Sequence, residues 1–207
     1  IKFSKKFAAS TALLASFLYA ILPPILHRTV AGVPEIESLG LAWLWFALFF
    51  FILAWKSESR KKQLIYSLIA GILTGLMSWS WGGYRYIYMA IALTSFVFFI
   101  LEKEKEKNFL IFSSWIIPAL VFEFIRIERF SPMALRVSDT GFAFFVFFLM
   151  ILDFILFKTR LGEKLKIEKI RIPKSILSLV FGIAFVILAL LVISPGFLLG
   201  IPSKIID

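Results

Sequence analysis

Residues 39–55 read LGLAWLWFALFFFILAW, an apolar run that contains no charged side chain. A helix that crosses the hydrocarbon core of a membrane needs about 20 apolar residues, within a range of roughly 17–25. The run has this length and this composition. It therefore predicts a transmembrane helix.

Six more stretches of the chain approach the same length. The breaks between them are short and polar, among them KSESRKKQ at 56–63 and EKEKEKN at 102–108. The sequence therefore predicts an all-α, polytopic integral membrane protein with about seven transmembrane helices, in one multi-span domain over residues 1–207. The predicted spans are about 7–26, 39–55, 64–80, 86–101, 109–125, 140–157 and 175–194.

The composition agrees with a membrane protein and excludes several other classes. Of the 207 residues, 60% are hydrophobic and 17% are charged, and the mean hydropathy is +0.93. Soluble domains are nearer half apolar and about a quarter charged, so a soluble enzyme, a disordered tail and a nucleic-acid-binding domain are excluded. The chain has no cysteine and a single histidine, His27, which excludes disulfides, thiolate metal sites and a histidine cluster.

The Lys and Arg residues divide unequally between the two sides of the predicted membrane domain. Four segments on one side, 1–6, 56–63, 102–108 and 158–174, hold 17 of the 23. By the positive-inside rule, that side is cytoplasmic. We therefore expect a multi-pass cell-membrane protein whose N-terminus is cytoplasmic. Its Gly-, Pro- and aromatic-rich loops, which suit a binding site, would then face outside.

Two acidic residues lie inside the predicted spans, where ionisable side chains are functional candidates. Glu123 precedes Arg126 by three residues, and Asp153 precedes Lys158 by five. Residues at such spacings can form ion pairs near the membrane boundary, and we favour this interpretation over a proton relay. It argues against an ion-coupled transporter, whose polar groups lie near the midplane.

The loop before the span at 39–55 carries two carboxylates, Glu35 and Glu37, at spacing i, i+2. On a curved backbone their oxygens can approach one point, and oxygen ligands suit hard cations such as Mg²⁺ or Mn²⁺. The alternative is structural: Ser38 can cap a helix that begins at Leu39, and the two acids favour the positive end of that helix. Residue types alone leave both interpretations open.

Two segments, taken together and in order, resemble a known family. Residues 28–37 read RTVAGVPEIE, and residues 78–84 read SWSWGGY. They resemble motifs of the catalytic subunit of oligosaccharyltransferase, in which an Arg-Ser/Thr-Val-Ala-Gly stretch leads into an acidic-x-acidic pair, and a Ser-Trp-Gly-Gly-Tyr segment joins two later spans. The resemblance is detailed over about residues 16–95.

The resemblance implies part of the membrane domain of a GT-C-type glycosyltransferase. Members transfer a glycan from a polyprenyl (dolichyl or undecaprenyl) phosphate or diphosphate to Asn of Asn-x-Ser/Thr, with a divalent metal, Mn²⁺ or Mg²⁺. By this similarity, Glu35 and Glu37 bind the metal, and Arg28 is the catalytic arginine beside the metal and the acceptor. The implied partners are a lipid-linked oligosaccharide, an acceptor polypeptide and membrane lipids, with no nucleic acid.

The same resemblance assigns Trp81, Gly82, Gly83, Tyr84 and Arg85 to the lipid-donor site. Glycines permit close approach of the backbone, the aromatic rings suit contact with sugar or polyprenyl, and Arg85 is a candidate partner of the phosphate. Structural alternatives exist for this segment also. Trp and Tyr anchor helices at the membrane interface, and a Gly-Gly pair can make a turn between helices.

The sequence departs from the family pattern at several points. The acidic pair begins with Glu35 where members usually have Asp, so the ligand is one methylene longer. No equivalent of the family's first acidic motif precedes His27. The loop with the catalytic glutamate and the soluble C-terminal domain with Trp-Trp-Asp-Tyr-Gly have no counterpart either. We therefore expect the chain to be an internal piece of a longer enzyme and to be inactive alone.

Other classes stay open on the sequence alone. They are another lipid-phosphate-sugar-dependent glycosyltransferase, a transporter and a structural membrane segment. A transporter would predict inverted repeats and midplane polar groups, and the sequence shows neither. The abundant Ile, Phe and Lys, with no Cys, are compatible with a thermophilic archaeal source.

Overall fold

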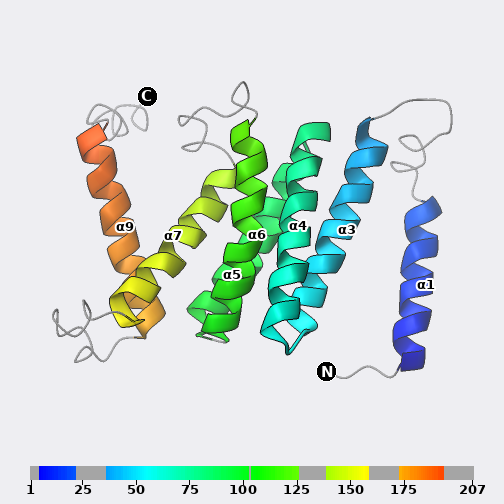
Figure 1. Cartoon of the computed structure of the whole chain (residues 1–207), viewed down its shortest axis with the longest axis horizontal. Helices are drawn as coiled ribbons and strands as arrows, with labels where there is room; N and C mark the ends of the chain where they lie inside the picture. The colour runs from blue at the N-terminus through cyan, green and yellow to red at the C-terminus, as the bar shows by residue number, and fades with distance from the viewer. Residues whose placement is uncertain (1–4, 22–35, 103, 126–138, 159–172, 194–207) are drawn as a thin grey trace, which may run out of the picture.

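The computed structural model describes residues 5–21, 36–102, 104–125, 139–158 and 173–193. Over these residues the chain forms seven α-helices and no strand, which confirms the predicted all-α fold (Figure 1). Each helix coincides with one of the predicted spans. The helices are α1 (Lys5–Ile21), α3 (Ile36–Lys56), α4 (Arg60–Ser80), α5 (Tyr84–Ile100), α6 (Lys105–Ile125), α7 (Asp139–Lys158) and α9 (Lys174–Ile193).

Four of these helices are long and apolar enough to cross a membrane, namely α3, α4, α6 and α7. α1 and α5 are also apolar but have 17 residues each, and α9 is apolar over Lys174–Leu188, the part whose side chains the structure describes. Many apolar side chains on the outer faces are exposed, as expected of surfaces that meet lipid chains rather than water. The described residues therefore form a membrane domain.

The helices stand side by side, with α1 and α9 at opposite edges (Figure 1). α3 packs on α4, α4 on α6, α5 on α7, and α7 on α9. The largest fully buried side chains include Trp115, Tyr88, Phe112 and Met77, which come from α4, α5 and α6. These three helices therefore hold the centre of the core.

The contact between α4 and α6 depends on small residues. A Cβ added at Gly71 would clash with the carbonyl oxygen of Trp115, and one added at Gly75 would lie 2.6 Å from Cβ of Phe122. Between the two glycines, Trp115 Nε1 donates a hydrogen bond of 3.0 Å to Thr74 Oγ1. Small residues four positions apart allow membrane helices to approach closely. This contact fixes the position of α4, whose last residue leads into the candidate site.

The helices end at two opposite sides of the domain (Figure 1). At the basic end, α3 ends at Lys56, and α4, α6 and α9 begin at Arg60, Lys105 and Lys174. At the Trp81 end, the turn at 81–83 joins α4 to α5, and α3 begins. α4 and α6 begin four residues before their predicted starts, because the charged residues of the basic end continue these helices beyond the apolar run.

The prediction that Ser38 caps a helix beginning at Leu39 is wrong. α3 is already helical at Ile36, so Ser38 lies within the helix. Glu37 lies in the first turn of α3, where its negative charge is favourable at the positive end of the helix dipole. One member of the predicted acidic pair is therefore held on a helix.

Candidate functional site

A pocket of about 800 Å³ lies at the Trp81 end, between the start of α3 and the turn that joins α4 to α5. It brings together one residue of the predicted metal pair and four of the five residues predicted for the donor site. Two motifs that are separated in sequence by two helices therefore share one pocket. The pocket is lined by Glu37, Trp81, Gly82, Gly83, Arg85, Tyr86 and Met89.

Trp81 forms the wall of this pocket and joins α3 to the turn. Its backbone is extended, with φ −144° and ψ 133°, and its N–H closes α4 by donating to the carbonyl oxygen of Met77 at 2.8 Å. The indole lies between two glycines: a Cβ at Gly40 would be 2.5 Å from Cβ of Trp81, and a Cβ at Gly83 would be 2.5 Å from its ring. The ring therefore occupies space that exists only because both neighbours lack side chains.

The two glycines of the turn have different roles. Gly83 has φ −71° and ψ −2°, which any residue can adopt, so the backbone conformation does not require a glycine at this position. The close contact with the indole of Trp81 does require one. Gly82 is exposed, and an added Cβ there would meet nothing within 4 Å. The space beside Gly82 is open to the pocket and allows another molecule to approach the backbone.

Two side chains of opposite charge line the pocket. Glu37 is half-buried in the first turn of α3, and Arg85 is exposed in the first turn of α5. At the N-cap of α5, Gly83 provides no side chain to bond the first N–H groups of the helix. A guanidinium beside a helix N-terminus suits a phosphate, and a carboxylate suits a cation or an N–H group.

Tyr84 is the one predicted donor residue that does not line the pocket. It is half-buried, and its ring contacts that of Tyr88 edge-on, with 5.9 Å between centroids. In its place the pocket is lined by Tyr86 and Met89, which sequence reasoning missed. Met89 could have been predicted from the sequence, because it follows Arg85 by four residues and so lies on the same face of the helix.

Several predicted residues lie outside the described part of the chain. Arg28, Glu35 and the lone His27 are among residues 22–35, so their roles stay predictions. Within the described residues, no three His, Asp or Glu side chains come together to hold a metal ion. Of the predicted ligands, the structure places only Glu37 in the pocket.

One of the two acidic residues of α6, Glu123, is buried in the last turn of this helix. Glu123 is 8% exposed, and its predicted partner, Arg126, lies outside the described residues. One carboxylate oxygen of Glu123 and the hydroxyl of Tyr88 are both buried. Next to Glu123, the carbonyl oxygen of Phe122 accepts a hydrogen bond of 2.8 Å from Trp79 Nε1, which ties α6 to the end of α4.

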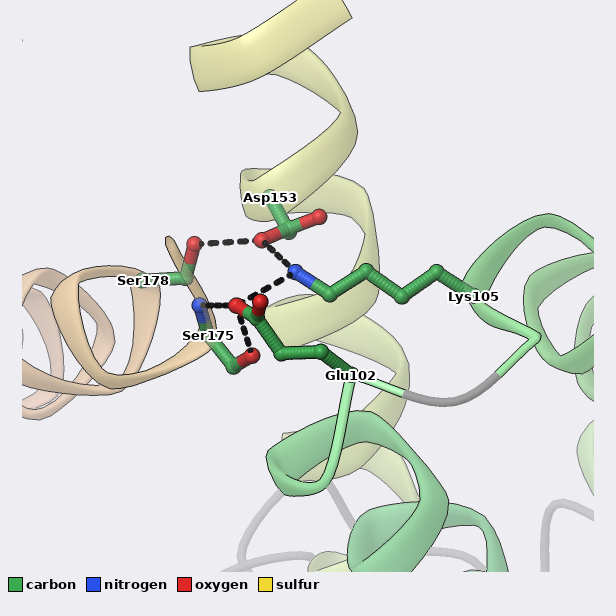
Figure 2. Close-up of polar contacts among 5 residues, drawn as sticks. All are labelled: Glu102, Lys105, Asp153, Ser175 and Ser178. Carbon is green, nitrogen blue, oxygen red and sulfur yellow. Dashed lines mark hydrogen bonds and ion pairs between the residues drawn. The ribbon is translucent and has the colours of Figure 1, made fainter. Parts of the chain in front are cut away.

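A second polar cluster lies at the basic end (Figure 2). Lys105 Nζ lies 3.3 Å from Glu102 Oε1 and 3.3 Å from Asp153 Oδ1. Asp153 therefore forms an ion pair with Lys105, at the start of α6. The structure describes the backbone of Lys158, the partner expected from sequence spacing, but not its side chain, so that pair stays a prediction.

The same cluster holds the start of α9. Ser175 donates two hydrogen bonds to Glu102 Oε1, from its N–H at 3.0 Å and from its hydroxyl at 2.7 Å. Ser178 donates to Asp153 Oδ1 at 2.9 Å (Figure 2). The N–H of Ser175, the hydroxyl of Ser175 and the ammonium of Lys105 together lower the pKa of Glu102 to about 2. The turn between α5 and α6 is thereby joined to α7 and α9.

Comparison with known families gives one match. The model of the family described as Oligosaccharyl transferase STT3, N-terminal, matches residues 4–206. No curated protein and no solved structure matches the chain.

Proposed function

The chain belongs to the oligosaccharyl transferase STT3 family, and from this premise we propose that its Trp81 end binds a polyprenyl-phosphate-linked glycan for transfer to Asn of Asn-x-Ser/Thr. The family is one of glycosyltransferases that act in protein N-glycosylation. Membership favours this function over the transporter and structural interpretations. The chain is then the membrane part of a larger transferase.

The observation that carries the proposal is the shared pocket. Glu37 and the segment from Trp81 to Arg85 belong to different motifs, yet they line the same cavity of about 800 Å³. A donor site needs a cation for the phosphate and an apolar or aromatic surface for the polyprenyl chain and sugar. Arg85 supplies the first, and Trp81, Tyr86 and Met89 supply the second.

The acceptor side of the proposal rests on the acidic pair. A divalent cation, Mn²⁺ or Mg²⁺, would be held by Glu35 and Glu37, and it would supply Lewis-acid polarisation of the acceptor amide. The carboxylate of Glu37 is a suitable ligand for such a cation, because these ions prefer oxygen donors. Arg28, which precedes the pair, would add a fixed positive charge beside the acceptor.

The proposed reaction is a displacement at the anomeric carbon of the sugar. The bond between that carbon and the lipid phosphate oxygen breaks, and a bond to the Asn amide nitrogen forms. The amide nitrogen loses a proton to a carboxylate, and the phosphate leaves with the electron pair of the broken bond. Arg85 would stabilise the negative charge on the leaving phosphate. Electrostatic stabilisation of the transition state is usually the largest single contribution to catalysis. The first acidic motif and the catalytic glutamate of the family would come from outside these residues.

Donor binding tests the proposal without requiring turnover. The 207-residue chain in lipid nanodiscs is titrated with a fluorescent dolichyl-phosphate-linked sugar, and the dissociation constant is measured by anisotropy. We expect Arg85→Gln to weaken binding by a factor of about 10–100, because a hydrogen bond to a charged group is worth about 1.5–3 kcal/mol. Arg85→Lys should retain part of the affinity.

The matched control removes one positive charge at the opposite end. Lys62 is exposed in the first turn of α4 and does not line the pocket, so Lys62→Gln should leave donor affinity within about twofold. A dissociation constant for Arg85→Gln that equals that of the control would remove Arg85 from the donor site.

A further inference from the structure

A second pocket, of about 750 Å³, lies at the basic end, opposite the proposed donor site. It is formed by the first residues of α4, α6 and α9 and by the last turns of α7. Its position places it at the level where these apolar helices leave the hydrocarbon. It is lined by Glu58, Arg60, Gln63, Glu104, Lys105, Glu106, Lys107, Phe109, Leu110, Met150, Asp153, Phe154, Phe157 and Lys174.

The lining of this basic-end pocket has two parts. Its charged part holds four bases and four acids, and its apolar part comes from α6 and α7. Phe109 and Phe154 stack face to face across these helices, with 5.5 Å between ring centroids and an interplanar angle of 9°. A charged region continuous with an aromatic wall matches an amphiphile, whereas equal numbers of acids and bases disfavour a polyanion.

Three of the four bases are already paired with carboxylates. Arg60 lies 3.2 Å from Glu106, Lys107 lies 2.9 Å from Glu104, and Lys105 is held in the cluster of Figure 2. Lys174 differs from them. No described carboxylate lies within ion-pair distance of its ammonium, which sits over the ring of Phe157 at 5.3 Å from the centroid.

The backbone at Lys174 is also held in place. It begins α9, and the residue after it, Ser175, is fixed by two hydrogen bonds to Glu102 (Figure 2). The exposed side chain of Lys174 therefore starts from a fixed point of the backbone, and its ammonium lies where the charged part of the pocket meets the aromatic part. A ligand with one negative charge next to an apolar chain would contact both.

We propose that the basic-end pocket binds one membrane phospholipid, with its phosphodiester at Lys174 and an acyl chain against Phe154 and Phe157. The phosphate recognition comes from the one base without a described carboxylate partner, and the apolar wall selects a lipid over a free anion. This site is independent of the donor pocket, because the two lie at opposite ends of the same helices.

The test measures lipid retained by the purified chain. The 207-residue chain is mixed in detergent micelles with either dioleoyl-phosphatidylglycerol or dioleoylglycerol as the only lipid, and analysed by native mass spectrometry. We expect one retained phosphatidylglycerol and no comparable retention of dioleoylglycerol. Lys174→Gln should reduce retention roughly fivefold, as expected from one lysine near a lipid phosphate, and Lys174→Arg should preserve it.

The control Lys62→Gln removes the same charge from an exposed first turn outside the pocket and should leave retention unchanged. Equal losses for Lys174→Gln and Lys62→Gln would overturn the proposal in favour of general surface attraction. Loss of retention in Lys174→Arg would overturn it too, since that variant keeps the charge. Displacement of the lipid by inorganic phosphate alone would show an anion site without lipid recognition, which also contradicts it.

Discussion

At the scale of single residues, the indole of Trp81 lies between two glycines, Gly40 on α3 and Gly83 at the start of α5. The contact with the indole explains why position 83 is a glycine. The turn itself does not require a glycine there, because Gly83 has an ordinary helical φ. The sequence motif singled out the Gly-Gly pair, whose place in a donor site stays a prediction. Which glycine meets the indole could be learned only from the packing.

Gly83→Ala tests the packing of Trp81. The new Cβ would lie 2.5 Å from the indole ring, so the ring must move, and overpacking of this kind costs about 1–3 kcal/mol. We expect a lower midpoint of unfolding in a denaturant titration of the detergent-solubilised chain, together with weaker donor binding.

Gly82→Ala is the matched control, because an added Cβ there meets nothing within 4 Å. It should leave the unfolding midpoint unchanged. If Gly83→Ala and Gly82→Ala behave alike, Trp81 does not occupy the position described.

Glu102 links stability to pH at the basic end. Its pKa is lowered from 4.5 to about 2, first by the N–H and hydroxyl of Ser175 and then by Lys105. Because the folded-state pKa is the lower one, its stabilising effect is complete above the unfolded pKa and is lost as the pH falls from about 4.5 towards 2. We expect thermal unfolding midpoints of the wild type to fall over this range, and those of Glu102→Gln to change less.

The comparison variant for this pH effect is Glu58→Gln, since Glu58 has no ion pair with a described residue. It should follow the wild-type pH profile. A Glu102→Gln profile that matches the wild type at every pH would show that the Ser175 contact adds no stability.

At the scale of helices, the apolar runs predicted all seven described elements, and most boundaries agree within a few residues. The pattern works because a membrane span must satisfy its own backbone hydrogen bonds over an apolar length. The partners of polar side chains could not be predicted in this way. Sequence spacing paired Asp153 with Lys158, whereas the described partner is Lys105, which only the packing of α6 near α7 brings close.

The contact of α4 with α6 makes a prediction at this scale. Gly75→Leu places a large side chain where even a Cβ would lie 2.6 Å from Phe122, so the helices must separate. We expect the denaturant midpoint to drop by an amount that corresponds to about 1–3 kcal/mol or more. Donor binding should weaken with it, because α4 carries the turn that forms the pocket.

The control for this change also enlarges a side chain on α4, but on its exposed face. Leu68 is 48% exposed, and Leu68→Phe should have little effect. If Leu68→Phe destabilises the chain as much as Gly75→Leu does, the face of α4 that carries Gly75 is not the one that packs closely on α6.

At the scale of the whole molecule, the turns between the described helices gather at two opposite ends, and each end carries one of the two pockets. Glu37 and the turn at 81–83 are separated by two helices, so the chain returns to the end from which it started, and the two motifs line one pocket. The order of motifs in the sequence was enough to expect this proximity. It was not enough to expect Tyr86 and Met89 in the lining, or Tyr84 against Tyr88 instead.

A polyprenyl phosphate with a photoreactive group next to its phosphate tests most directly whether the Trp81 end holds the donor. The chain is irradiated with this probe in nanodiscs, and the labelled residues are identified by peptide mass spectrometry. We expect the label within residues 81–89, with a lower yield in Arg85→Gln. Label confined to the basic end, or spread equally over all helices, would contradict the assignment of the donor site.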